Sequence, residues 1–395
     1  MSRLASRAEQ AKLARELGVP DTGLDFLADL PPEALRHFRV AVTDLFFDEQ
    51  RLLLRWLASV ARWLPSWLSA LLARLWLGSL LTARLASELP AWRVAEIARH
   101  LSPGFMADIA TRLDPRGARE LLQLLAPVQI VAVTQVLLAR RDFITMGRFV
   151  ALLPDEVVSE AAGAIGDEGD LVQAVFYIEA RNRLDHLVRV LPRERVERAI
   201  LMVCDDSRRD LWPALLALVS HVGYGLRREL GDLAAAQGEG VLNAIVRAAQ
   251  EDGLWEDLLP VVACLSPEVQ RQVVNLDSLQ APAVMASIIR ATEERDLWTA
   301  MLALAQHMNE AGRDVLAQAM DRTGGPVLEH AAHAALLRAQ WHTALDIVRR
   351  MPVARHQECL RILARYLDTL DAETATQLTS ALQLHGIGVP AALTI

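Results

Sequence analysis

Four octapeptides, each headed by tryptophan, decide the fold: WPALLALV at 212–219, WEDLLPVV at 255–262, WTAMLALA at 298–305 and WHTALDIV at 341–348. Successive tryptophans are 43 residues apart, and apolar residues follow each one at offsets of three, four and seven positions. Those offsets place the apolar residues on one face of an α-helix. A constant period of this length is typical of stacked helical repeats. Residues 143–395 are therefore predicted to form armadillo-like units, each with two long helices and a shorter one between them.

The repeated tryptophans are predicted to pack between neighbouring units, because one short helical unit cannot bury its apolar face alone. The residues with this role are Trp212, Trp255, Trp298 and Trp341. A row of stacking platforms for single-stranded nucleic acid is the alternative, but such channels also need a cationic groove. Asp210, Glu256 and Asp296 lie beside these tryptophans, so packing is favoured.

A second, shorter repeat lies in residues 87–142. Leu-Pro or Leu-x-Pro turns recur every 12 residues, at Leu89-Pro90, Leu101-Ser102-Pro103, Leu113-Asp114-Pro115 and Leu125-Ala126-Pro127. Proline has no N–H and a fixed φ, which suit the first turn of a helix, so each turn predicts the start of a short helix. Such short helices are not stable alone. They are expected to wind into a right-handed superhelix, an α-solenoid that continues into the 43-residue units.

These turns resemble those of the cytoplasmic N-terminal helical domain of MgtE-type magnesium transporters. The armadillo-like repeats of flagellar motor switch protein G are built similarly, and the resemblance covers roughly residues 89–155. It implies a superhelical fold. In the transporter this domain is acidic and takes part in magnesium sensing, whereas the acidic residues of the short units here do not recur at a single offset. No metal ligands are carried over, and neither a metal nor a cofactor is expected.

Residues 51–86 form a third kind of segment, with four tryptophans, five arginines and no acidic residue. Pro65 is expected to divide it into two helices. The favoured interpretation is a buried hairpin whose arginines reach solvent or pair with acids. The next is an amphipathic hairpin at a membrane interface, with tryptophan at the headgroup level and arginine toward anionic lipid. A protein-contact surface fits that second pattern equally well.

A transmembrane span is the least favoured interpretation of residues 51–86. Its uncharged runs are shorter than the ~20 residues that a crossing needs, and Arg74 would lie within the span. The residues expected to contact a membrane or a partner are Trp56, Trp63, Trp67, Trp76, Arg55, Arg62 and Arg74.

Composition excludes several classes of protein. The net charge of −8 argues against nonspecific nucleic-acid binding, which depends on neutralising phosphates. Three distant cysteines, Cys204, Cys264 and Cys359, indicate a reducing compartment rather than a disulfide framework. The polar N-terminal segment has no apolar core of a secretory signal, so a cytoplasmic location is expected. Lys12 is the only lysine among 41 basic residues, a bias that indicates a bacterium with G+C-rich DNA.

No catalytic constellation is recognisable. His330 and His333 are three positions apart, whereas the zinc-protease helix needs histidines four apart with a glutamate between them. Cys204 precedes two aspartates, which disfavour a thiolate. Asp167 and its acidic neighbours lack the spacing of a calcium loop. The chain is therefore not expected to be an enzyme.

Four segments are expected: 1–50 with N-terminal helices, 51–86 with the apolar hairpin, 87–142 with the short repeats and 143–395 with the long repeats. The predicted function is a non-catalytic scaffold or adaptor. It would bind a protein partner and dock peripherally on the inner face of the cytoplasmic membrane through residues 51–86. A carrier or sensor of a lipid or another apolar small molecule is the alternative. The identity of the partner and the oligomeric state stay open.

Overall fold

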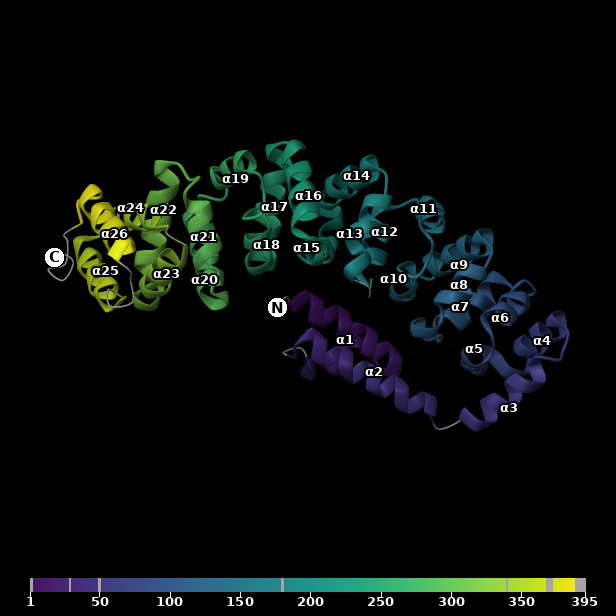
Figure 1. Cartoon of the computed structure of the whole chain (residues 1–395). Coiled ribbons are helices and arrows are strands. Elements are labelled where there is room, and N and C mark those ends of the chain that lie inside the picture. The colour runs from purple at the N-terminus through teal and green to yellow at the C-terminus, as the bar shows by residue number, and fades with distance from the viewer. Residues whose placement is uncertain are drawn as a thin grey trace. The chain divides into compact units, whose positions relative to one another are not determined.

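The computed structural model describes residues 3–27, 30–48, 51–178, 181–338, 340–366 and 372–387. Within these ranges it contains 26 α-helices and no strand, and its helical content is 80% (Figure 1). The predicted all-α class is confirmed.

The chain divides into two units. Unit 1 comprises Met1–Val203 with Asp210–Val222, and unit 2 comprises Cys204–Arg209 with Gly223–Ile395. The division falls inside the segment 143–395, which sequence analysis treated as one array. Its cause is α15 (Trp212–His221), which packs on α1 (Arg3–Leu17) and α12 (Glu168–Phe176) and so belongs to unit 1.

Unit 1 contains an N-terminal pair of helices, a tryptophan-rich stretch and a series of mostly short helices. Besides the three just named, its elements are η1 (Asp21–Leu27), α2 (Pro32–Asp48), α3 (Arg51–Ala61), α4 (Ser66–Leu72), the π-helical turn η2 (Ala73–Leu77), α5 (Gly78–Glu88), α6 (Ala91–Ala98), α7 (Pro103–Ala110), η3 (Pro115–Gly117), α8 (Arg119–Leu124), α9 (Pro127–Ala139), α10 (Phe143–Val150), α11 (Asp155–Gly163), α13 (Arg181–Val190) and α14 (Arg193–Val203). The starts of α7, η3 and α9 fall on the prolines of the 12-residue repeat.

The short helices of unit 1 pack on their next-but-one neighbours. Contacts join α5 with α7, α7 with α9, α9 with α11 and α11 with α13, while α4, α6 and α8 form a second such series. Side chains that precede the prolines cap two of the starts. Ser102 Oγ accepts a hydrogen bond from Phe105 N (3.4 Å), and Asp114 Oδ1 accepts one from Arg116 N (3.0 Å). Capping and proline together begin these helices where the repeat predicts.

Unit 2 consists of helices that follow one another in chain order. They are α16 (Tyr224–Ala236), α17 (Glu239–Asp252), α18 (Trp255–Val262), α19 (Pro267–Val274), α20 (Pro282–Arg295), α21 (Trp298–Ala305), α22 (Glu310–Thr323), α23 (Gly325–Arg338), α24 (Trp341–Arg349), α25 (Val353–Tyr366) and α26 (Ala372–Leu384). Next-but-one packing recurs, as in α20 with α22 and α21 with α23.

The order of helix lengths within a 43-residue unit differs from the prediction. In the units that begin at Trp212, Trp298 and Trp341 the tryptophan-headed helix is the shortest and longer helices follow it, whereas α18 and α19 are equally short. In the unit of Trp298 the next cap limits the first helix: Asn309 Oδ1 accepts a hydrogen bond from Gly312 N (2.7 Å) and begins α22 soon after α21 has ended. Because asparagine favours this capping position, the chain cannot extend the tryptophan-headed helix past it.

The same backbone turn precedes the tryptophans of unit 2. Leu254 N donates to Ala249 O (2.9 Å), Leu297 N to Thr292 O (2.9 Å) and Gln340 N to Ala335 O (3.0 Å). These bonds close the end of the preceding helix in the manner of a Schellman motif. Gly253 and Asp296 occupy the left-handed region that the motif needs, with φ of 66° and 52°. The 43-residue period therefore repeats this backbone turn as well as the tryptophan that follows it.

All four repeated indoles are buried, with exposures of 5% for Trp212, 3% for Trp255, 1% for Trp298 and 5% for Trp341. Two indole N–H groups find acceptors on the preceding helix. Trp255 Nε1 donates to Gln250 Oε1, and Trp298 Nε1 donates to Glu293 Oε2, both at 3.0 Å. A buried indole therefore stabilises by apolar burial without leaving its polar atom unpaired.

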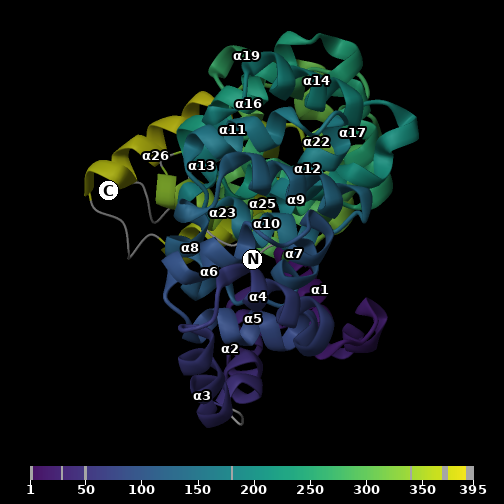
Figure 2. The same cartoon turned by 90° about the vertical axis from the view of Figure 1, so that its right-hand side faces the viewer.

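The hairpin of α1 and α2 (Figures 1 and 2) contains a buried group of charges. Lys12, which is 3% exposed, lies 3.0 Å from Glu9 Oε1, and Arg39 Nη2 lies 3.3 Å from Glu9 Oε2. Burial alone would raise the pKa of Glu9, but Lys12 and Arg39 outweigh it and hold this pKa below its ordinary value of 4.5. Glu9 is thus charged at neutral pH and pairs with both buried cations.

Acid is expected to weaken this hairpin. Because the folded-state pKa of Glu9 is depressed, its contribution to stability is full above pH 4.5 and is lost as the pH falls through the folded-state value. In urea titrations, the wild type should lose more free energy of unfolding between neutral pH and pH ~3 than Glu9→Gln, whose amide does not titrate. An equal loss of unfolding free energy in both proteins would contradict the conclusion that charged Glu9 stabilises the hairpin.

Candidate membrane-contact surface and apolar cavity

The tryptophans of residues 51–86 lie on the outside of unit 1. Trp56 is 63% exposed, Trp63 91%, Trp67 57% and Trp76 82%, and Trp92 in α6 adds a fifth ring at 57%. We call these five residues the indole surface. They lie on or beside consecutive elements that contact one another, namely α3 with α5, α4 with α6, and η2 with α4 and α5. Monomeric soluble proteins rarely leave so many large apolar side chains together in water.

Exposed apolar residues around these rings follow helical spacing. Val60 lies four positions after Trp56, and Leu71 and Leu75 lie four and eight after Trp67; all are exposed. Residues four apart lie on the same side of a helix. The exposed rings therefore belong to apolar stripes rather than to isolated positions.

The favoured interpretation of residues 51–86 as a buried hairpin is wrong for these rings. Among residues 56–86, whose side chains the structure describes, the buried positions are small, and comprise Ala58, Ala61, Ser69, Ala70, Ala73 and Ala83 together with one larger residue, Leu85. Small side chains let helices approach one another closely, so the alanine faces pack inward. The bulky indoles are left exposed.

Arg62 and Arg74 are exposed, whereas the side chain of Arg55 lies outside the described residues. A further arginine, Arg93, was missed by sequence reasoning because it follows the segment. It is buried and donates from Nη2 to Leu64 O and to Ala61 O (3.3 Å), while Nη1 bonds Glu96 Oε2 (2.8 Å). Arg93 thereby attaches the end of α3 to α6 and holds the turn that presents Trp63.

Among the described residues, one helical run, Ser66–Glu88, has the length and composition to cross a membrane; a third of its most apolar window is buried. Gly78 interrupts this run with φ 68° and ψ 177°, a conformation that glycine adopts readily and other residues do not. At ~1.5 Å per residue the two parts are about 18 and 16 Å long, each well below the ~30 Å of a hydrocarbon core. Neither part alone has the length of a crossing.

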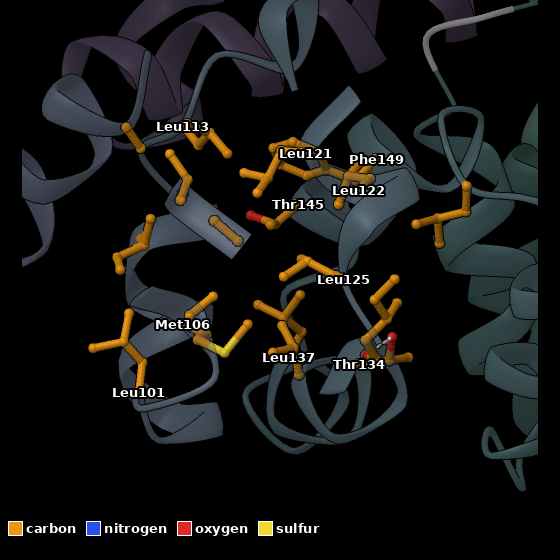
Figure 3. Close-up of a pocket in the computed structure, with 18 of the residues that line it drawn as sticks. Leu101, Met106, Leu113, Leu121, Leu122, Leu125, Thr134, Leu137, Thr145 and Phe149 are labelled. Atoms are coloured by element: carbon orange, nitrogen blue, oxygen red, sulfur yellow. Dashed lines mark hydrogen bonds between the residues drawn. The ribbon is translucent and has the colours of Figure 1, made fainter. Parts of the chain in front are cut away.

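Beside this surface, unit 1 encloses a partly open apolar cavity of about 420 Å³ (Figure 3). Its lining comes from successive elements between α3 and α13. Figure 3 shows Met106, Leu113, Leu125, Leu137 and Thr145 around the cavity. None of the described lining residues is charged. A closed, dry void of this volume would cost roughly 10 kcal/mol at ~24 cal/mol per Å³, which is comparable to the stability of a whole domain.

Four hydroxyl groups line the cavity, and three of them are paired. Thr82 Oγ1 donates to Gly78 O (2.6 Å), Thr134 Oγ1 to Ile130 O (3.0 Å) and Thr145 Oγ1 to Asp142 Oδ2 (2.9 Å). Ser69 is different: it is only 7% exposed, and its Oγ has no hydrogen-bond partner in the described structure. A buried hydroxyl without a partner costs free energy, so this group is available to a bound molecule.

Asp142 links the cavity wall to the N-terminal hairpin. Its carboxylate accepts hydrogen bonds from Nη1 and Nη2 of Arg15 in α1, and Oδ1 also caps α10 through Thr145 N (3.1 Å). Burial would raise the pKa of Asp142, but these hydrogen bonds and the charge of Arg15 lower it. The aspartate is therefore charged and holds α1 against the start of α10.

The other candidate residues have structural surroundings. His330 Nδ1 lies 2.8 Å from Glu293 Oε1, and His333 packs against Tyr366. Among the described residues, no group of three or more histidine, cysteine or acidic side chains is placed to hold a metal ion. Burial raises the pKa of the Cys204 thiol to about 11, which makes it a poor nucleophile at neutral pH.

The acidic cluster near residue 167 begins a helix. Asp167 Oδ1 accepts a hydrogen bond from Asp170 N (3.0 Å) at the start of α12. Glu168 binds Arg195 and Arg198, and these two arginines hold its pKa below the ordinary value although burial would raise it. The carboxylates are thus engaged in capping and ion pairs.

No protein-family model and no curated protein matches the chain.

Proposed function

We propose that this chain is a non-catalytic helical-repeat protein that docks peripherally on a membrane through the indole surface, with Arg62 and Arg74 attracted to anionic lipid. The exposure of five indoles on consecutive helices carries the proposal. Tryptophan prefers the headgroup level of a bilayer because its ring is apolar and its N–H is polar. A cation near an anionic surface adds about 1 kcal/mol.

The proposal includes an α-solenoid with right-handed superhelical winding and armadillo-like units. The next-but-one packing of helices in each unit and the recurrent turn before Trp255, Trp298 and Trp341 support it. Repeat arrays present long surfaces to other proteins. A scaffold or adaptor that binds a protein partner at the cytoplasmic face of a membrane is therefore the role that we assign to the whole chain.

Vesicle flotation tests the docking. The intact protein should float with phosphatidylcholine vesicles that contain about one-third phosphatidylglycerol, and moderate salt should weaken but not abolish this binding. The apolar part of the interaction should survive because salt screens charges only. Protein that stays at the bottom of the gradient at both salt concentrations would rule out a membrane role for the indole surface and leave a protein contact as its explanation.

A further inference from the structure

We infer that the apolar cavity of unit 1 binds one neutral long-chain lipid, whose aliphatic chain fills the cavity and whose single polar end group bonds Ser69. This inference deepens the proposed membrane docking, on which it rests for the source of the ligand. The cavity volume of about 420 Å³ lies within the range of small-molecule sites, roughly 300–1,000 Å³.

The apolar lining of the cavity favours an aliphatic ligand. It comes from a long series of elements, α3 to α13, and consists of leucine, valine, isoleucine, alanine and other apolar side chains apart from the four hydroxyl residues. An ion transferred from water to such surroundings loses its hydration without gaining a partner. The lining therefore disfavours an anionic or cationic group inside the cavity, and it fits the uncharged body of a lipid.

Ser69 defines the polar end of the occupant. The three threonine hydroxyls of the lining donate to protein oxygens, so they have no proton left to offer. The Ser69 hydroxyl is buried and can both donate and accept. A ligand hydroxyl or ester oxygen would satisfy it. A pure hydrocarbon would leave it unpaired.

The cavity and the indole surface share Trp76, which lines the cavity and is 82% exposed. Leu57 and Val60 on α3 and Leu72 on α4 also reach the lining, and they come from the elements that carry Trp56 and Trp67. A lipid that leaves a bilayer under these rings could therefore enter the cavity along a continuous apolar path. This continuity identifies membrane lipid, rather than a soluble metabolite, as the source of the ligand.

Equilibrium binding of radiolabelled 1-hexadecanol to the purified full-length chain tests the inference. We expect saturable binding of one molecule, with palmitate at pH 8 bound at least tenfold more weakly because its carboxylate is charged. Ser69→Ala should weaken hexadecanol binding about threefold to tenfold, the loss of one hydrogen bond, and should leave hexadecane binding unchanged. Met106→Glu, which places a charge in the apolar lining, should weaken hexadecanol binding at least a hundredfold.

Leu337→Glu, at an exposed position of unit 2, is the matched control for the added charge and should bind as the wild type does. Thermal unfolding of each variant shows that it is folded, and Met106→Trp, which adds bulk to the lining without charge, should also reduce binding. Absence of hexadecanol binding by the wild type, or binding that neither Ser69→Ala nor Met106→Glu changes, would overturn the inference.

These experiments test the lipid site and membrane docking independently. Trp63 and Trp67 do not line the cavity, so Trp63→Ser/Trp67→Ser should lose vesicle flotation and keep hexadecanol binding in solution. Met106→Glu should keep flotation and lose hexadecanol. A wild type that floats without binding hexadecanol overturns the lipid site alone, and one that binds hexadecanol without floating overturns the docking and the membrane source of the ligand.

Discussion

Replacement of Trp298 by alanine should lower the free energy of unfolding of unit 2 by about 3–5 kcal/mol, the usual cost of removing a buried aromatic side chain. The ring is 1% exposed, so its removal leaves a cavity rather than a wetted surface. It also leaves Glu293 without the indole N–H that it accepts at 3.0 Å. Urea unfolding followed by circular dichroism, together with hydrogen exchange of α20 to α22, measures the loss.

Trp63→Ala is the matched control for Trp298→Ala, because the same atoms are removed from a ring that is 91% exposed. Its free energy of unfolding should stay within about 0.5 kcal/mol of the wild type, as is usual for surface substitutions. Comparable destabilisation by both variants would show that Trp298 does not support the packing of neighbouring helices.

Trp63→Ser/Trp67→Ser should weaken binding to anionic vesicles about a hundredfold. The two side chains are 91% and 57% exposed, and burial of apolar surface in a membrane interface contributes about 25 cal/mol per Å². Vesicle titration followed by sedimentation measures the affinity. The double variant should unfold at the temperature of the wild type, because neither ring is buried in the folded chain.

Arg62→Gln/Arg74→Gln is the complementary variant, since it removes charge and keeps the rings. It should lose roughly tenfold to thirtyfold in affinity for anionic vesicles, about 1 kcal/mol for each cation. It should bind uncharged vesicles as the wild type does. If the serine variant instead bound both kinds of vesicle like the wild type, the indoles would have no part in docking.

The positions of helices were predictable where a local signal marks them. Pro103 and Pro127 begin α7 and α9, and Trp255 begins α18, because proline geometry and the preceding turn act within a few residues. The burial of Trp298 follows from the same periodic pattern. In each case the chemistry of neighbouring residues determines the local structure.

The outward orientation of Trp63 and Trp67 was not predictable from the same kind of pattern. The helices of residues 51–88 carry small apolar residues such as Ala70 and Ala73, which are buried, and large rings, which are exposed. Periodicity does not separate the two sets. Which of them packs inward depends on how closely the neighbouring helices approach, which is a tertiary property.

The cavity could not be predicted either. Ser69 and Thr145 are far apart in the sequence and each reads as an ordinary polar position in an apolar helix. Only the fold brings them to one lining, and only the hydrogen bonds there distinguish the paired Thr145 from the unpaired Ser69. The place of Trp212 in unit 1 likewise depends on contacts of α15 with α1 and α12.

Tryptophan fluorescence with brominated lipid tests the membrane-contact surface most directly. Of the nine tryptophans, five are exposed on the indole surface and four are buried in the helical packing. On anionic vesicles that contain brominated acyl chains, the emission of the exposed rings should shift to the blue and be quenched, while the buried rings keep their emission. An emission spectrum that these vesicles leave unchanged at low salt would contradict the account.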